Sequence, residues 1–378
     1  MDDLAPALSP LKLMFSNTYR NRRVLVTGHT GFKGSWLSQW LVGLGADVTG
    51  LSAYVPSTPS HFELLGLEKR LQHRVGDVRD RTAVSATLEA VQPEIIFHLA
   101  AQPIVRAAYD NPAATFETNI GGVVNVLDVV RDCPSVRAVV VITSDKCYEN
   151  VEWEFGYRET DALGGKDPYS ASKACAEIVF SCYARSYFAG PDAPGVASGR
   201  AGNVIGGGDW AAHRIVPDCM RAWATGAEPL IRSPRATRPW QHVLEPLSGY
   251  LWLGAQLLAA APGLRGEAFN FGPAASVNAS VEQLLGQMSS MWTDVRWRTE
   301  PVAATVKPEA GLLKLNCDKA LHRLQWEAVL SFEETAAMTA DWYMQHYRSG
   351  RPALELTTTQ INDYERLARE RRRPWAKS

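Results

Sequence analysis

A chain of 378 residues and 41.5 kDa is longer than one compact core usually becomes, so we expect two lobes, or one lobe with a large insertion. Its 39 basic and 40 acidic residues give a formal charge of −1, which argues against a nucleic-acid-binding protein. The absence of a bilayer-length apolar run and of a basic, apolar leader, together with six scattered cysteines lacking any C-x-x-C pair, predicts a reduced cytoplasmic protein with no membrane partner.

Strand-length and helix-length segments alternate through the first half of the chain. The expected strands are 22–27, 46–51, a third that ends at 73–77, 94–99 and 136–143, and the expected helices are 35–45, 81–91, 112–131 and 169–187. This alternation implies parallel strands with right-handed crossovers, and the uninterrupted apolar strands fit a sheet covered on both faces. The predicted fold class is therefore α/β, a doubly wound parallel sheet of the Rossmann type.

After about residue 195, glycines and prolines interrupt the pattern and predict longer loops, with further helical segments at 247–260, 281–292 and 332–347. We divide the chain into an N-terminal extension, a dinucleotide-binding domain, a smaller mixed substrate-binding lobe and a basic C-terminal tail. Their bounds are 1–20, 21–200, 201–350 (with 240–262 returning to the first domain) and 351–378. The basic helical tail is interpreted as a solvated end or a subunit contact.

A glycine-spaced turn at 27–34 follows the first strand and opens the first helix, which is the context of a dinucleotide-binding fingerprint. Gly28 allows the tight turn, Gly31 lets the main chain approach a pyrophosphate, and Gly34 lets helix and strand pack closely. Free N–H groups at the positive helix end would hold the anion. Lys33 either pairs with the pyrophosphate or is solvated, and a purely structural turn is the alternative interpretation.

The acidic residue expected after the second strand, where it would bind the ribose hydroxyls, is missing. The sequence there is GLSAY at 50–54, so discrimination against a 2′-phosphate is not assured. The local chemistry therefore leaves NAD and NADP both open, and we take NAD as the expected cofactor without excluding NADP. Asp77, after the third strand, is placed either to meet the adenine or to cap the next helix.

Tyr169 and Lys173 stand four residues apart on one face of a predicted helix. A tyrosine with its ordinary pKa of about 10 is a poor base at neutral pH, but a lysine ammonium and a positive nicotinamide ring would favour the phenolate. Y-x-x-x-K alone is common by chance; after a glycine turn and five β/α units it indicates a dehydrogenase-type site. Ser144, just past the fifth strand, would complete a hydroxyl–tyrosine–lysine set.

Taken together, the motifs resemble those of the extended short-chain dehydrogenase/reductase family, from residue 22 to about 345. They are TGHTGFKG (27–34), GDVRD (76–80), HLAAQ (98–102), NP and TNIGG (111–122), TSDK (143–146) and YSASK (169–173). Within this family the chain resembles the nucleotide-sugar 4,6-dehydratases, and among them the branch that acts on CDP-glucose. Asp145-Lys146 after Ser144 carries that assignment, because the branch acting on dTDP-glucose has Asp-Glu there.

The resemblance implies a lyase that converts CDP-D-glucose to CDP-4-keto-6-deoxy-D-glucose and water in deoxysugar biosynthesis. Tyr169 would take the 4-hydroxyl proton while hydride leaves C4, and the hydride would return at C6. Lys146 is the candidate base for the C5 proton, or else an anchor, and burial near other cations would favour its neutral form. Asp145 is the candidate acid for the departing water, with a helix cap as the alternative.

The resemblance also implies two sets of binding residues, and no metal site is recognised. The cofactor would be lined by Gly28, Thr30, Gly31, Phe32, Lys33, Gly34, Asp77, Val78, Leu99, Ala100, Ala101, Thr118, Asn119, Thr143, Tyr169 and Lys173. The nucleotide-sugar substrate would be contacted by Gln102, Asn203, Arg214 and Arg238. The planar guanidinium of Arg238 suits a diphosphate, because it donates two parallel hydrogen bonds. We expect His98, Trp210 and Trp240 to be packed side chains.

Three alternatives stay open: an epimerase or decarboxylating relative, a dehydratase for another nucleotide, and a non-catalytic dinucleotide sensor. Family members commonly pair two helices into a four-helix dimer contact, so a homodimer is expected. Apolar residues of the two corresponding helices support it: Val123, Val126 and Val130, and Ile178, Val179 and Tyr183.

Overall fold

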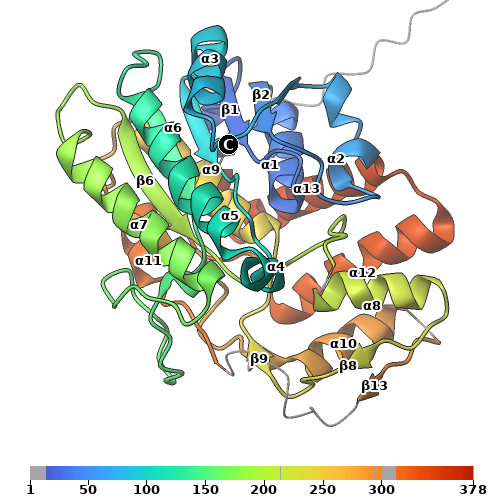
Figure 1. The fold of residues 1–378 in the computed structure, drawn as a ribbon. Helices are drawn as coiled ribbons and strands as arrows, with labels where there is room; N and C mark the ends of the chain where they lie inside the picture. Colours follow the sequence, from blue (N-terminus) through green and yellow to red (C-terminus); the bar gives the residue numbers. More distant parts are fainter. Residues whose placement is uncertain (1–13, 213, 293, 300–311, 378) are drawn as a thin grey trace, which may run out of the picture.

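The computed structural model describes residues 14–212, 214–292, 294–299 and 312–377 (Figure 1). Its centre is a seven-stranded parallel sheet in the order β11-β6-β5-β4-β1-β2-β3. The strands are β1 (Arg23–Thr27), β2 (Asp47–Ser52), β3 (Gln72–Val75), β4 (Ile95–His98), β5 (Ala138–Ile142), β6 (Gly195–Arg200) and β11 (Ala268–Asn270). The order reverses between β1 and β4, so the predicted doubly wound fold is confirmed.

Strand residues alternate between two apolar cores, one on each face of the sheet. In β1, Val24 and Val26 join the core that contains α1 (Phe32–Gly43) and α9 (Leu244–Leu258). Leu25 points the other way, into the core under α3 (Arg81–Val91), α6 (Gly122–Val130) and α7 (Pro168–Ser186). Figure 1 shows α3, α6 and α7 side by side across that face. Coverage of both faces explains why the central strands β1, β4 and β5 are almost entirely apolar, whereas the edge strand β3 is polar.

The predicted helix at 112–131 is interrupted. It consists of α5 (Pro112–Phe116), a π-helical turn at Glu117–Gly121, and α6. The turn carries Asn119, whose side-chain oxygen accepts from the Gln102 backbone N–H at 2.8 Å and whose amide donates to Ser172 Oγ at 2.8 Å. The irregular turn therefore ties the loop after β4 to α7, where the predicted site lies.

The second half of the chain forms a smaller region of short strands and helices. Its two-stranded sheets pair β7 (Val204–Ile205) with β10 (Gln241–His242), β9 (Thr237–Arg238) with β12 (Ala279–Ser280), and β8 (Leu230–Ile231) with β13 (Arg298–Thr299). Its helices include α8 (Ile215–Ala224), α10 (Val281–Met291) and α12 (Phe332–Ser349). α9 instead packs on β5 and β6 of the main sheet. The remaining α-helices are α2 (His61–Leu64), α4 (Val105–Asp110), α11 (Asp318–Leu324) and α13 (Ala353–Glu370).

The prediction of a solvated C-terminal tail is wrong. α13 packs against α1, α2 and α12, and buries Leu356, Ile361 and Tyr364. Trp375 beyond it is fully buried and stacks between Tyr364 and Phe15, with ring centroids 5.7 and 5.1 Å away. Phe15 belongs to the presumed N-terminal extension, whose residues 1–13 lie outside the described range. The described part of the extension and the tail therefore contact each other inside the core.

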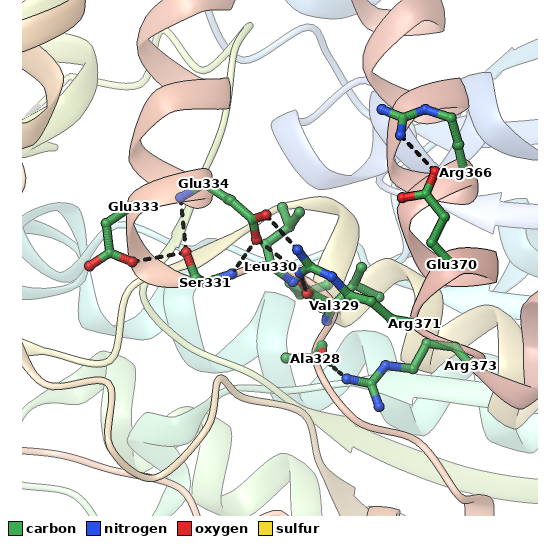
Figure 2. Close-up of polar contacts among 11 residues, drawn as sticks. Ala328, Val329, Leu330, Ser331, Glu333, Glu334, Arg366, Glu370, Arg371 and Arg373 are labelled. Atoms are coloured by element: carbon green, nitrogen blue, oxygen red, sulfur yellow. Dashed lines mark hydrogen bonds and ion pairs between the residues drawn. The ribbon is translucent and has the colours of Figure 1, made fainter.

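The arginines that suggested a solvated tail are partly used within the protein. Figure 2 shows Arg371 and Arg373 reaching the segment at the start of α12. Arg371 pairs with Glu334 and donates to the carbonyl of Val329, and Arg373 donates to the carbonyl of Ala328 at 2.7 Å. These contacts fasten the chain end, because each satisfies a carbonyl or a carboxylate. No helix in the described part of the chain is both long and apolar enough to cross a membrane.

Candidate active site

The glycine turn between β1 and α1 has the close backbone contacts that only glycine permits. Gly28 has φ +74°, and a Cβ there would lie 2.7 Å from the backbone N of Ala100. A Cβ at Gly34 would lie 2.1 Å from the carbonyl oxygen of Gly28. Gly31 precedes α1 in an extended conformation without a side-chain cap, which leaves first-turn N–H groups free to bind an anion. The turn therefore fits a dinucleotide pyrophosphate.

Lys33 extends from this turn toward the predicted catalytic residues, and its side chain is half-buried. Its ammonium lies 5.9 Å from the centroid of the buried Tyr250 ring. Burial, followed by the charges of Lys173 and Arg214, lowers the pKa of Lys33 to about 7, and Asp145 opposes the change. Its contact with a pyrophosphate remains a prediction.

A chain of hydrogen bonds occupies the position where the ribose-binding acid was expected. Ser52, at the end of β2, contacts His29 Nδ1 at 2.9 Å, and His29 Nε2 contacts His73 Nδ1 at 2.7 Å. Burial and the neighbouring His73 lower the pKa of His29 to about 3, so His29 is neutral. Thr30 closes the loop by donating to the Tyr54 carbonyl at 2.7 Å. This side of the ribose position therefore carries no negative charge.

Asp77 does not cap α3, because Asp80 accepts from the Thr82 N–H at 2.8 Å and fills that position. The Asp77 carboxylate binds the backbone N–H of Arg79 at 2.9 Å and its guanidinium at 2.6 Å. These hydrogen bonds from Arg79 lower the pKa of Asp77. The adjacent Val78 is buried against α6, since a Cβ at Gly122 would lie 2.8 Å from it. Contact between Asp77 and an adenine remains a prediction.

The hydroxyl, the phenol and the carboxyl of the predicted catalytic set lie together past the end of β5. Ser144 Oγ donates to Asp145 Oδ1 at 2.8 Å and is hydrogen-bonded to Tyr169 of α7. Asp145 Oδ2 accepts from the Asn203 amide at 3.1 Å. A Cβ at Gly202 would lie 1.9 Å from the Asp145 carboxyl carbon, so backbone also confines this side chain. The carboxyl group therefore faces the phenol.

Burial dominates the titration of the two α7 residues. It raises the pKa of Tyr169 to about 12, although the charge of Arg214 acts to lower it. Burial lowers the pKa of Lys173 to about 8, and the carboxylate of Glu177 opposes that change. Among the protein's cations, Arg214 is the principal one acting on the phenol, whereas the sequence had pointed to Lys173.

The side chain of Lys146 is half-buried at the first turn after Ser144. Its backbone N–H donates to Ser144 Oγ at 3.3 Å, which places the residue beside the catalytic hydroxyl. Within the described ranges its ammonium has neither a hydrogen-bond nor an ion-pair partner. The choice between base and anchor therefore remains a prediction.

The four predicted substrate contacts divide into two groups. Asn203 lies against Asp145, and Arg214 lies beside Tyr169, paired with Asp209 at 2.9 Å while 35% of its side chain stays exposed. Gln102 is used inside the loop after β4, because its amide nitrogen donates to Thr115 and its oxygen accepts from the Ile104 N–H. Arg238 lies in β9 and donates to the carbonyl of Thr237 at 2.8 Å.

The remaining predicted cofactor residues surround the glycine turn. The Ala100 N–H, between Leu99 and Ala101, donates to Thr27 Oγ1 at 3.2 Å, and the same hydroxyl contacts His98 Nδ1 at 2.7 Å. The hydroxyls of Thr118 and Thr143 bind within the protein, to the Ala114 carbonyl and to Glu177. His98, Trp210 and Trp240 are buried and hydrogen-bonded, as predicted.

Sequence reasoning missed a buried polar network beneath this site. Its centre is the ion pair between Glu177 of α7 and Arg200 of β6, with an N–O distance of 2.7 Å. Glu177 stands four residues after Lys173 and eight after Tyr169, and this helical spacing was the available signal. A search of the described residues for three or more potential metal ligands in one group found none.

A family model described as GDP-mannose 4,6 dehydratase matches residues 25–339. The chain is 43% identical to a CDP-glucose 4,6-dehydratase of Salmonella typhimurium, over 92% of this chain and 97% of the relative. It is 26% identical to a dTDP-glucose 4,6-dehydratase of Xanthomonas campestris, over 85% and 92%. Among solved structures, an epimerase of Methanothermobacter thermautotrophicus matches with a TM-score of 0.76 and 22% identity, covering 93% of this chain and 99% of that one. A dTDP-glucose 4,6-dehydratase of Streptomyces venezuelae, solved with NAD, matches with a TM-score of 0.69 and 24% identity over 88% and 99%.

Proposed function

Because this chain belongs to the nucleotide-sugar epimerases and dehydratases of the extended short-chain dehydrogenase/reductase family, we propose that it is a lyase converting CDP-D-glucose to CDP-4-keto-6-deoxy-D-glucose and water. One observation carries the dehydration. The buried carboxyl group of Asp145 is confined beside Ser144, Asn203 and Tyr169. An epimerase needs the hydroxyl, the phenol and the lysine, whereas loss of water also needs an acid at this place.

The cradle at the start of α1 fits a nicotinamide dinucleotide, because Gly28 and Gly34 leave room that a Cβ would fill. Relatives of the same fold are described with bound NAD. The dinucleotide, when bound, would supply the hydride chemistry at C4 and C6 of the hexose. Gly28, Gly31 and Gly34 would hold its pyrophosphate through backbone N–H groups. NAD is proposed from these relatives; the neutral Ser52–His29 pair places no carboxylate against a 2′-phosphate, so NADP stays the alternative.

Tyr169 is the proposed base for the 4-hydroxyl proton. The phenol must lose its own proton first, and its pKa of about 12 makes that unfavourable at neutral pH. The charge of Arg214 already favours the phenolate. The positive charge of an oxidised nicotinamide would add to it.

Asp145 and Lys146 are proposed for the elimination. Oxidation at C4 makes the C5 proton acidic, and the neutral amine of Lys146 would accept it. Asp145, protonated, would give its proton to the C6 hydroxyl, which leaves as water. Its hydrogen bonds to Ser144 and Asn203 would orient the acid toward the hexose.

Arg214 and Arg238 are the proposed cationic contacts of the substrate. The Arg214 side chain is 35% exposed and lies beside Tyr169, and a guanidinium can bind two oxygens of a diphosphate at once. The cytidine base is proposed from the 43% identity to a CDP-glucose 4,6-dehydratase. Gln102 is the weakest member of this set, because its amide is already used within its own loop.

A substrate panel tests the proposal. CDP-, dTDP-, GDP- and UDP-glucose are incubated with the chain and NAD, and the product is identified by mass spectrometry. We expect the wild-type protein to eliminate water from CDP-glucose. The Asp145→Asn variant should no longer do so. Asp218→Asn, a partly exposed carboxylate paired with Arg221 on α8, is the matched control and should remain active. An epimerised product that retains its water would contradict the proposal.

A cytoplasmic homodimer is the remaining part of the proposal. The six cysteines are all free, which supports a reducing compartment. The dimer argument from α6 is wrong, because Val123, Val126 and Val130 are buried in the subunit's own core. On α7, Ile178 is 57% exposed, so a contact through that helix stays proposed.

A further inference from the structure

The buried pair of Glu177 and Arg200 lies directly behind the catalytic residues. Their side chains are 1% and 4% exposed. Glu177 follows Lys173 by one helical turn, and Arg200 ends β6 next to the loop that carries Asn203. Such a pair does not stabilise a fold by itself, because removing two charges from water costs about as much as their attraction returns. The hydrogen bonds that this pair makes to neighbouring residues indicate a role other than stabilising the fold.

The pair holds both ends of the segment 143–148. At one end, Thr143 Oγ1 donates to Glu177 Oε1. At the other end, Arg200 Nη1 donates to the Tyr148 hydroxyl at 2.7 Å. Ser144, Asp145 and Lys146 lie between these two attachment points. The carboxylate–guanidinium pair therefore holds in place the stretch of backbone that carries them.

The same pair is anchored to the ends of neighbouring strands. Ser198 Oγ of β6 donates to Glu177 Oε2 at 2.9 Å, and the Tyr148 hydroxyl donates to Asn270 Oδ1 of β11 at 2.7 Å. Asn270 in turn donates to the carbonyls of Tyr157 and Asn316. Hydrogen bonds between buried side chains therefore connect the segment to α7 and to the sheet. In the low-dielectric interior these hydrogen bonds are stronger than in water, so they keep the segment in one orientation.

We infer that Glu177 and Arg200 are positioning residues that hold the segment 143–148 in register with Tyr169 and Lys173. This inference rests on the proposed function, since it concerns the same reaction. Neither residue touches the hexose, so both act through the groups they hold. Loss of the Glu177 charge would leave Thr143 and Tyr148 less firmly held and would leave Arg200 unpaired.

Glu177 also affects the charge of Lys173. The titratable groups acting with Lys173 come from several elements: Glu177 on the same helix, Cys147 from the segment, His98 from β4 and Lys33 from α1. Only Glu177 among them is an ordinary anion. Burial lowers the pKa of Lys173 to about 8 against the effect of this carboxylate, so removal of the carboxylate would lower that pKa further.

The test compares Glu177→Gln with Glu245→Gln. Glu245 is an equally buried carboxylate on α9, bound to the N–H groups of Val329 and Leu330 at a distance from the site. For Glu177→Gln we expect kcat for CDP-glucose to fall at least ~10-fold while KM changes less than ~2-fold. The alkaline limb of the kcat profile should move to lower pH, because Lys173 loses its proton more readily. Glu245→Gln should leave both unchanged.

A Glu177→Gln variant with the kcat and pH limb of the wild type would overturn the inference. Should this variant fail to fold, Thr143→Val removes one attachment and keeps the ion pair. A fall in kcat of a few-fold with an unmoved pH limb then supports the inference, and an unchanged kcat overturns it. An inactive wild type would contradict the proposed function instead. A crystal structure of Glu177→Gln then decides, since displacement of 143–148 supports the inference and an unmoved segment contradicts it.

Discussion

Two buried regions join residues far apart in the sequence, and they do so with opposite chemistry. The polar brace (Thr143, Tyr148, Glu177, Arg200 and Asn270) is built of charges and hydrogen bonds. The aromatic junction (Phe15, Trp40, Tyr364 and Trp375) is built of stacked and edge-on rings. Ring burial contributes free energy of folding, whereas a buried ion pair mainly fixes positions. Changes near the brace should therefore affect the reaction, and changes in the junction should affect stability.

The largest expected effect is at Tyr169, on the helix that the brace holds. Tyr169→Phe removes the phenol but keeps the ring, so we expect kcat to fall about 10²–10⁴-fold, the usual contribution of a general base. Unfolding by urea should change little, because only the hydrogen bond with Ser144 is lost. A Tyr169→Phe variant with kcat near that of the wild type would refute the proposed proton transfer.

Trp375→Ala should reduce stability and leave activity unchanged, which is the opposite of the result expected for Tyr169→Phe. The side chain is fully buried between Phe15 and Tyr364, so its removal should cost about 3–5 kcal/mol of unfolding free energy. Activity per folded molecule at 25 °C should stay unchanged. Urea unfolding followed by tryptophan fluorescence measures the first, and kcat at low temperature the second. An unchanged urea midpoint would mean that the junction is not part of the core.

The dependence of stability on pH should distinguish Glu245 from Glu177, the buried carboxylate of the polar brace. Glu245 is bound by backbone N–H groups and by the Tyr364 hydroxyl at 2.8 Å, and no ion pair to it is found among the described residues. Burial raises its pKa to about 7 in the folded state. Because the pKa of Glu245 is higher in the folded protein than its unfolded value of about 4.3, the protonated carboxyl group contributes fully to stability below that pH. This contribution is lost as the pH rises through about 7.

Glu245→Gln cannot titrate, so its stability relative to the wild type should improve between pH 5 and pH 8. The expected change is up to ~3 kcal/mol, from about 1.4 kcal/mol for each pKa unit. Urea unfolding of both proteins at the two pH values measures it. A difference that stays constant with pH would show that Glu245 is ionised throughout, as expected for a carboxylate with a cation partner.

The smallest expected effect is at Gln102, which sits beside neither region. Its amide binds Thr115 and the Ile104 N–H, so Gln102→Ala should cost about 1 kcal/mol of stability and leave KM for CDP-glucose within ~2-fold. Urea unfolding and steady-state kinetics check the two parts. A KM raised by ~10-fold would restore Gln102 as a substrate contact.

Local patterns predicted the sheet and the glycine turn, because each depends on residues adjacent in the chain. The α3 helix begins and ends where its apolar spacing indicated. The aromatic junction could not be predicted in this way, since Phe15 and Trp375 meet only after the whole chain has folded. A basic sequence such as ERRRP reads as solvated, although Arg371 and Arg373 bind the start of α12.

The sequence likewise predicted some residues of the candidate site and missed others. Ser144, Asp145 and Tyr169 come from motifs and lie together in the structure. Arg200 could not be found from the sequence, because one arginine at the end of a strand gives no sign of its partner. Lys33 showed the limit of motif reading, since its backbone belongs to the cofactor turn while its ammonium lies near Asp145 and Lys173.

The central claim is that this pocket oxidises C4, eliminates water across C5 and C6, and reduces C6 within one active site. Incubation of the protein with CDP-glucose deuterated at C4, followed by mass spectrometry and NMR of the sugar, tests it directly. The account predicts a 4-keto-6-deoxy product that carries the deuterium on C6. A product that keeps its C6 hydroxyl, or one formed with the deuterium still on C4, would contradict it.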